Sequence, residues 1–181
     1  NHQIVPNDTL SIILTNDNCK SLRIEILRLP DDAKSGRYSL KAGATPQVYK
    51  SFDITYKNNI PFAINDTLKT TISQPGYYTV IAYNDDIEKN LNNLDILYCS
   101  ELTSVCANQF NDDYRIWVLN AKSGKVINNA EINIYKNATQ AVKTNPLFTT
   151  KSTRDGKIKF DNKNNGQYNY SIVKGEDKFS P

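Results

Sequence analysis

The sequence predicts an all-β protein made of two tandem antiparallel β-sandwich domains, at residues 1–107 and 108–181. Apolar and polar residues alternate with a period of two through most of the chain, as they do in half-buried strands. The alternating runs are short and rich in Ile, Val, Thr and Tyr, and clusters of Asn, Asp, Gly and Pro separate them, which is typical of strands joined by turns. A length of 181 residues accommodates one large domain or two small ones.

The first domain is predicted to contain a series of strands. The alternation predicts them at residues 10–14, 22–29, 38–40, 48–56, 68–72 and 77–83. The best helical candidate, Ile87 to Leu94, contains Asn90, Asn92 and Asn93, and we expect at most one turn there because asparagine is a poor helix former.

The second domain is predicted after a polar boundary at residues 107–113. Strands are expected at residues 116–118, 130–134, 149–150, 158–160 and 168–172. Asp155-Gly156 favours a type I′ turn, so residues 149–150 and 158–160 are predicted to form a hairpin. The domain has only about 70 residues, and it is open at this point whether it is complete.

The composition excludes several function classes. A balance of 22 basic and 19 acidic residues gives no footprint for nucleic acid, and no run approaches the roughly 18 apolar residues of a membrane helix. The one histidine is His2, so a Ser–His or Cys–His mechanism lacks its base. The acidic pairs at 31–32, 85–86 and 112–113 are expected to be solvated loop residues, with a calcium loop as the alternative. The chain is therefore predicted to be no enzyme, with no metal and no cofactor.

Three cysteines, Cys19, Cys99 and Cys106, leave at least one thiol unpaired. Cys99 and Cys106 lie in or beside one apolar run, and in an extended chain they would be about 23 Å apart, too far for a disulfide. Small buried apolar side chains are the expected role, and a Cys19–Cys99 disulfide is the alternative. There is no CxxC motif and no second histidine for a zinc site.

The aromatic residues offer two opposed interpretations. The tyrosines at 77, 78, 83, 168 and 170 would form a flat platform for sugar rings if exposed, whereas tyrosines at a period of two on strands usually pack on sheet faces. Trp117 has the opposite parity to Ile116 and Val118. It is expected to face outward or into the seam between the two domains; we favour the seam, so that Trp117→Ala would loosen the domains.

A basic cluster surrounds the predicted hairpin. It comprises Lys151, Arg154, Lys157 and Lys159, with Asp155 and Asp161 interleaved. Lysines on an edge strand discourage edge-to-edge aggregation, so the cluster is expected to be a solvated edge.

Several motifs, in this order, resemble a known family. They are the strand Ser21–Leu29, the segment Pro75-Gly-Tyr-Tyr-Thr-Val80, the segment Ile96–Leu102, the strand pair Leu119–Val126 and Asn129–Tyr135, and the segment Thr153–Phe160. The succession is similar to the N-terminal macroglobulin-like domains of large bacterial alpha-2-macroglobulin family proteins. The resemblance covers nearly the whole chain, although the motifs consist mostly of turn glycines and apolar core positions.

The resemblance implies non-catalytic scaffold domains of a secreted, periplasmic or cell-envelope protein that traps or inhibits proteases. Its signal or lipid anchor would lie outside this chain, which contains no methionine, and its partners would be neighbouring domains and proteases. The Cys-x-Glu-Gln thioester motif of some members does not match Cys99-Ser-Glu-Leu102 or Cys106-Ala-Asn-Gln109. The alternative is a cell-surface adhesin or carbohydrate-binding module on the same sandwich, which an exposed aromatic platform would favour.

Overall fold

The chain folds into two compact units, Asn1–Cys99 and Ser100–Pro181. The computed structural model describes residues 2–16, 20–30, 37–38, 47–56, 64–84, 89, 91, 94–108, 113–136, 145–161 and 168–180. Within these residues every regular element is a strand, and none is a helix that could cross a membrane. The all-β prediction is confirmed.

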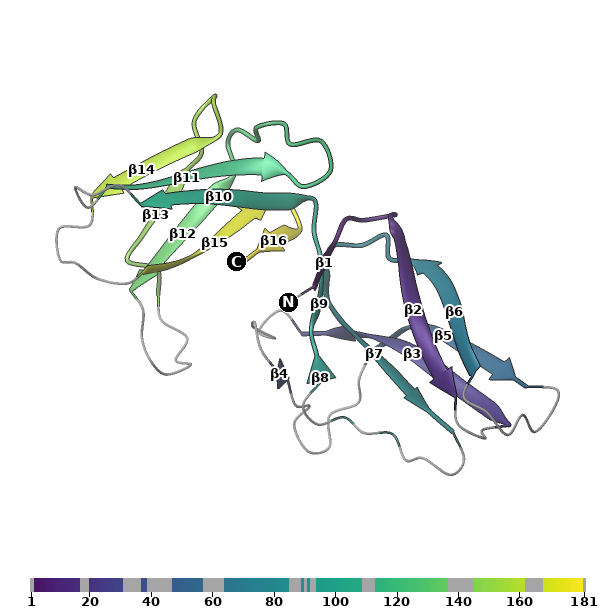
Figure 1. The fold of residues 1–181 in the computed structure, drawn as a ribbon. Helices are drawn as coiled ribbons and strands as arrows, with labels where there is room; N and C mark the ends of the chain where they lie inside the picture. The colour runs from purple at the N-terminus through teal and green to yellow at the C-terminus, as the bar shows by residue number, and fades with distance from the viewer. Residues whose placement is uncertain are drawn as a thin grey trace. The chain divides into compact units, whose positions relative to one another are not determined.

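The first unit is built on a five-stranded sheet (Figure 1). Its order is β1 (His2–Ile4), β9 (Leu97–Cys99), β7 (Gly76–Tyr83), β3 (Ser21–Leu29) and β5 (Gln47–Thr55). Neighbours are antiparallel, except that β1 runs parallel to β9. Residues 24–27 of the interior strand β3 are all buried, which means that both faces of the sheet are covered at this strand.

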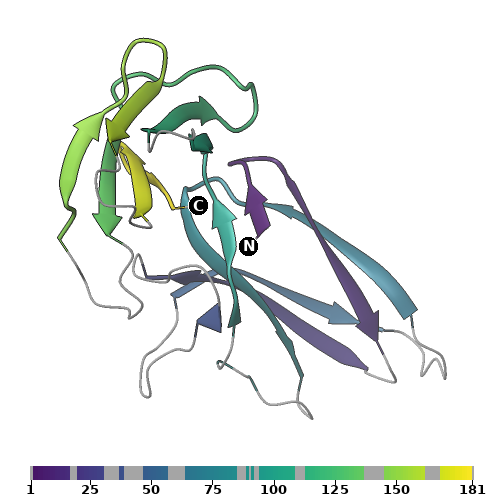
Figure 2. The same ribbon diagram turned by 60° about the vertical axis from the view of Figure 1, so that its left-hand side comes forward.

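A two-stranded ribbon, β2 (Thr9–Asn16) with β6 (Ile64–Thr71), supplies the second layer of this unit. Leu10 and Ile12 pack against a buried cluster formed by Ile26, Ile72, Tyr78 and Cys99. Figure 2 shows the ribbon lying alongside the five-stranded sheet. The short strands β4 (Arg37–Tyr38) and β8 (Leu94–Asp95) pair with each other.

The second unit consists of two facing sheets (Figure 1). One contains β10 (Leu102–Asn108), β11 (Asp113–Asn120) and β14 (Lys157–Asp161); the other has the order β13 (Phe148–Lys151), β12 (Glu131–Lys136), β15 (Tyr168–Lys174) and β16 (Asp177–Phe179). Fully buried side chains from both sheets, Ile116, Val118, Ile132, Ile134 and Ile172, form the core. Alternate residues of each strand thus face the other sheet, as a sandwich requires.

The structure divides the chain earlier than the expected boundary at 107/108. The segment 94–105, expected to be one apolar run, contains three strands, and the last of them, β10, pairs along its whole length with β11. Because this ladder belongs to the second sandwich, the second unit begins at Ser100. Ile87, from the helical candidate, lies outside the described residues, and Leu94 begins β8.

The predicted hairpin around Asp155-Gly156 is wrong. β13 pairs with β12, whereas β14 pairs with β11, so the turn connects two different sheets. The Gly156 amide donates to the Thr153 carbonyl at 2.9 Å, and only Gly156 in this turn has a positive φ, whereas a type I′ turn needs positive φ at both central residues. The sequence predicted the position of the turn but not the pairing of its strands.

Candidate functional site

Trp117 lies on the outer face of the β10–β11–β14 sheet. Its neighbours Ile116 and Val118 are fully buried between the sheets, whereas Trp117 is half-buried and stands opposite Val105 on one side and Lys157 on the other. The Lys157 ammonium lies 5.8 Å from the centroid of the indole ring, a cation–π contact. The role of Trp117 in a seam between the domains stays a prediction.

The predicted basic cluster is divided between the two sheets. Lys157 and Lys159 alternate with buried Ile158 on β14, so both belong to the outer face that carries Trp117. Lys151 ends β13 in the opposite sheet, and Arg154 lies in the connecting turn. The expectation of one edge hairpin bearing all four charges fails because that hairpin does not form.

The first residues of the second unit are held by side-chain and backbone contacts. The Asp177 Oδ2 atom accepts a hydrogen bond from the Glu101 amide at 2.8 Å, and the Glu101 carbonyl accepts one from the Ala121 amide at 2.7 Å. The Ser100 hydroxyl oxygen accepts a hydrogen bond from the Leu102 amide at 2.9 Å. Asp177 is only 7% exposed, and burial raises its pKa. These contacts fix the segment in which the chain enters the second sandwich.

A buried acid is the main charged feature of the first unit. Glu25, in the middle of β3, accepts hydrogen bonds from the Lys89 ammonium at 2.5 Å and the Tyr83 hydroxyl at 2.7 Å. Burial raises the pKa of Glu25, but the bonds from Lys89 and Tyr83 outweigh it, so that the pKa lies below its usual value. Since both carboxylate oxygens are engaged within the unit, this group stabilises the fold.

Among the described residues of the first unit, Tyr77, Tyr78 and Tyr83 form no open platform. Tyr77 and Tyr78 are buried; the Tyr77 and Tyr98 hydroxyls lie 3.0 Å apart, and the Tyr78 hydroxyl donates to the Gln74 carbonyl at 3.0 Å. Burial raises the pKa of Tyr78 to about 12. The Tyr83 hydroxyl donates a hydrogen bond to the buried Glu25 carboxylate.

Tyr114, Tyr168 and Tyr170 of the second unit belong to the packing between its sheets. Tyr168 meets Tyr114 and Phe160 edge to face, with centroids 5.9 and 5.6 Å away, and Tyr114 stacks on Phe160 at 5.1 Å. The Tyr170 and Ser104 hydroxyls lie 2.9 Å apart. Aromatic pairs of this kind stabilise a core, so these rings are packing residues rather than a sugar platform.

Cys99 and Cys106 do not form a disulfide with each other, which confirms that prediction. Cys99 is buried, as expected, and its Sγ lies 3.9 Å from the Ile72 carbonyl oxygen. Cys106 is exposed, contrary to expectation, because it lies on the edge strand β10. Cys19 lies outside the described residues, as do the acidic pairs 31–32 and 85–86, Asp112 and the side chain of Asp113. Within the described part, no three metal-ligating side chains come together.

The two units together define a class of protein: a tandem of all-β domains, each built from layered and mainly antiparallel sheets. The sequence matches no protein-family model and no curated protein.

The fold is similar to that of solved structures of native alpha-2-macroglobulin from Escherichia coli. For its domains MG0, NIE and MG1, the TM-score is 0.63 at 11% identity, covering 97% of this chain and 59% of that one. For NIE and MG1, the TM-score is 0.58 at 12% identity, covering 92% of this chain and 85% of that one. The native conformation solved by electron microscopy gives 0.51 at 13% identity, and this chain spans 11% of its length. The resemblance is thus confirmed for the fold.

Proposed function

We propose that this chain forms non-catalytic scaffold domains of a large alpha-2-macroglobulin-like protein that traps or inhibits proteases. The observation that carries the proposal is the similarity to the NIE–MG1 pair, which extends over 92% of this chain and 85% of that one. The similarity therefore includes most of both units. On this basis the first unit would correspond to NIE and the second to MG1.

The contacts inside the units support a scaffold. The buried carboxylates of Glu25 and Asp177 bond to groups of their own unit, and the tyrosines that could have bound sugars are packed into strand pairs and cores. A scaffold domain needs a stable, well-defined shape, and the carboxylate of Glu25, bonded through both oxygens, contributes to it. An adhesin with an aromatic platform would present these rings to solvent instead.

The proposal includes location and partners. The protein would be secreted or held in the periplasm or cell envelope, with its signal or lipid anchor outside this chain. Its partners would be neighbouring domains of the same polypeptide and the proteases that the whole protein captures.

The test uses the native protein that contains this chain, detected with an antibody against residues 1–181. We expect a polypeptide several times longer than the chain, which changes its hydrodynamic radius after limited proteolysis and then co-elutes with the protease. A protease with a chemically blocked active site is the matched control, because it can bind but cannot cleave and should not be retained.

Two results separate the alternatives. A small protein whose size and elution do not respond to active protease would contradict the trap and favour the surface-binding module. Release of a thiol by methylamine from a protein that does retain protease would reveal a thioester elsewhere in the polypeptide.

A further inference from the structure

The outer face of the β10–β11–β14 sheet carries an exposed apolar centre. Val105 stands opposite Trp117 and is 53% exposed, and Val126, which is 51% exposed, forms a β-bridge with Leu119. Leu119 follows Trp117 on the same face of β11. We call the outward side chains of this sheet the Trp117 face. Four apolar side chains side by side on an outer sheet face exceed the scattered exposed residues that need no explanation.

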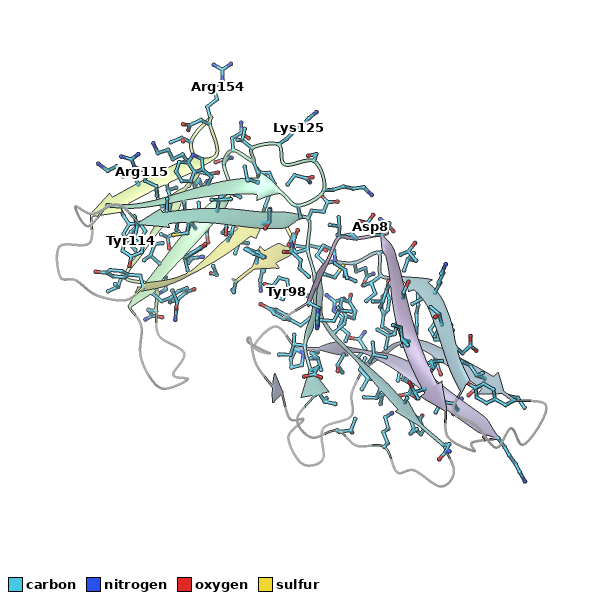
Figure 3. The ribbon with its side chains drawn as sticks, viewed as in Figure 1. Asp8, Tyr98, Tyr114, Arg115, Lys125 and Arg154 are labelled. Carbon is cyan, nitrogen blue, oxygen red and sulfur yellow. The ribbon has the colours of Figure 1, made fainter. Side chains whose placement is uncertain are left out.

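Cations border this apolar centre. Across β11 and β14, Trp117 pairs with Lys157 and Arg115 pairs with Lys159, which places three cations on adjacent positions. Figure 3 shows Arg115 and Tyr114 extending to opposite sides of their sheet. In the part of the chain that the structure describes, the buried Nε of Arg115 has no hydrogen-bond partner. By register, Asp113 pairs with Asp161 two residues beyond the pair of Arg115 and Lys159.

An apolar centre with a polar rim is the usual arrangement of a protein–protein contact, and tryptophan and arginine are enriched there. The Lys157 ammonium, held near the indole ring, gives the apolar centre a positive potential. A partner with carboxylates around an apolar contact would match that potential, since complementary charge fixes the partner and the register.

We propose that the Trp117 face docks on an acidic surface, with an apolar centre, of another domain of the same polypeptide outside residues 1–181. The choice of partner rests on the proposed function: this chain spans 11% of the E. coli protein of similar fold, so most of a comparable polypeptide would lie elsewhere. Because the rim is positive, the partner must present carboxylates around its apolar centre.

The test compares the full-length protein with the isolated 181-residue chain. Oxidative footprinting read by mass spectrometry should label Trp117 in the isolated chain and lose that label in the full-length protein. Carbodiimide, which joins amines to carboxylates in direct contact, should link Lys157 or Lys159 to Asp or Glu outside residues 1–181 of the same molecule. Lys69, exposed on β6 of the other unit, is the control lysine.

Charge-reversal variants test whether the contact depends on these lysines. Lys157→Glu combined with Lys159→Glu should restore labelling of Trp117 in the full-length protein and abolish the cross-links, whereas Lys69→Glu should change neither. Equal labelling of Trp117 in both proteins would overturn the proposal. Protection already present in the isolated chain would also overturn it and would favour the predicted seam between its own two domains.

The protease-retention experiment distinguishes this inference from the proposed function. If protease is retained but Trp117 is equally labelled in both proteins, the docking is wrong and the trap stands. If protease is not retained but the cross-links and the protection occur, the docking stands and the trap is wrong.

Discussion

Asp177 and Glu101, 76 residues apart in the sequence, are joined by a hydrogen bond of 2.8 Å from the Glu101 amide to the Asp177 Oδ2 atom. The contact ties the last strand of the second unit, β16, to the residues that lead into its first strand, β10. The other carboxylate oxygen of Asp177 is buried and accepts no hydrogen bond in the described structure. The site therefore combines a stabilising contact with a costly buried charge.

Replacing Asp177 should separate these two effects. Asp177→Ala leaves the Glu101 amide without its acceptor and should lower the free energy of unfolding by about 1–3 kcal/mol. Asp177→Asn keeps an oxygen acceptor and removes the charge, so it should be far less damaging. Urea unfolding at neutral pH measures both. An alanine variant as stable as the asparagine variant would contradict a role for the acceptor.

The same residue should give a distinctive pH dependence. Burial raises the pKa of Asp177 in the folded protein, while the unfolded chain keeps a value of about 3.9. As pH falls from the raised value towards 3.9, the folded state binds the proton first and gains stability. The wild type should therefore gain stability relative to Asp177→Asn over that window. Glu176→Gln, which removes an exposed neighbouring carboxylate, should leave the gain unchanged.

Glu25 should show the opposite slope. Its pKa is lowered in the folded state by Lys89 and Tyr83, which outweigh burial, so its stabilising effect is present above the usual glutamate pKa of about 4.3 and is lost as pH falls through the lowered value. Glu25→Gln should cost about 1.5 kcal/mol at neutral pH, near the lower end for bonds to a charged group, because the side chain of its partner Lys89 is 30% exposed and water screens that charge.

The control for Glu25 is an exposed ion pair on the same sheet. Arg23 Nε lies 3.0 Å from Asp53 Oδ1, with side chains 49% and 70% exposed, so Arg23→Gln should change stability less than Glu25→Gln does. Thermal unfolding across the acidic range compares the two variants. A Glu25→Gln curve parallel to that of the wild type would show that the buried carboxylate contributes nothing.

The sequence predicted the strands better than their pairing. Strands such as β3 and β7 follow from alternation, because side-chain direction in a strand has a period of two. Pairing depends on distant residues: Asp155-Gly156 marks a turn, but β11 and β12 draw its two flanking strands into different sheets. β16 was missed because Asp177–Phe179 is too short to show a period.

The charged sites were predictable to different degrees. Glu25 carried a signal, since a lone acid between Ile24 and Ile26 in an apolar strand must be paired if it is buried, and the structure supplies Lys89. Asp177 carried none, because it lies in a polar stretch that resembles any turn and its partner is remote in sequence. For Trp117, alternation gives the outward parity but cannot give the partner.

The two described thiols should differ in reactivity. Cys106 is exposed and Cys99 is buried, so iodoacetamide should alkylate Cys106 in the folded protein and Cys99 only after unfolding. Although Cys106 is exposed, partial burial of its thiol raises its pKa. Because the thiolate is the nucleophile, Cys106 should react more slowly near neutral pH than an unperturbed cysteine. Peptide mass spectrometry after timed labelling measures both rates, and equal labelling of Cys99 in the native state would contradict the packing of the first core.

The turn at Gly156 should tolerate no side chain. Its φ is +70°, and an added Cβ would lie 2.8 Å from the Val118 carbonyl oxygen and 3.0 Å from the Val126 Cβ. The strand β11 would have to move, although the Val118 amide also donates to the Gly156 carbonyl at 2.8 Å. Gly156→Ala should therefore lower the free energy of unfolding by the roughly 1–2 kcal/mol that a left-handed alanine costs, plus the cost of displacing the strand.

Gly124 provides a matched comparison within the same unit. Its φ is +67°, nearly the same, but nothing lies within 4 Å of an added Cβ. Gly124→Ala should thus lower the free energy of unfolding only by the cost of the left-handed conformation. The difference between the two variants in urea unfolding isolates the contact with Val118. Equal losses would mean that β11 yields without cost, and the close approach at Gly156 would then contribute nothing to the joining of the two sheets.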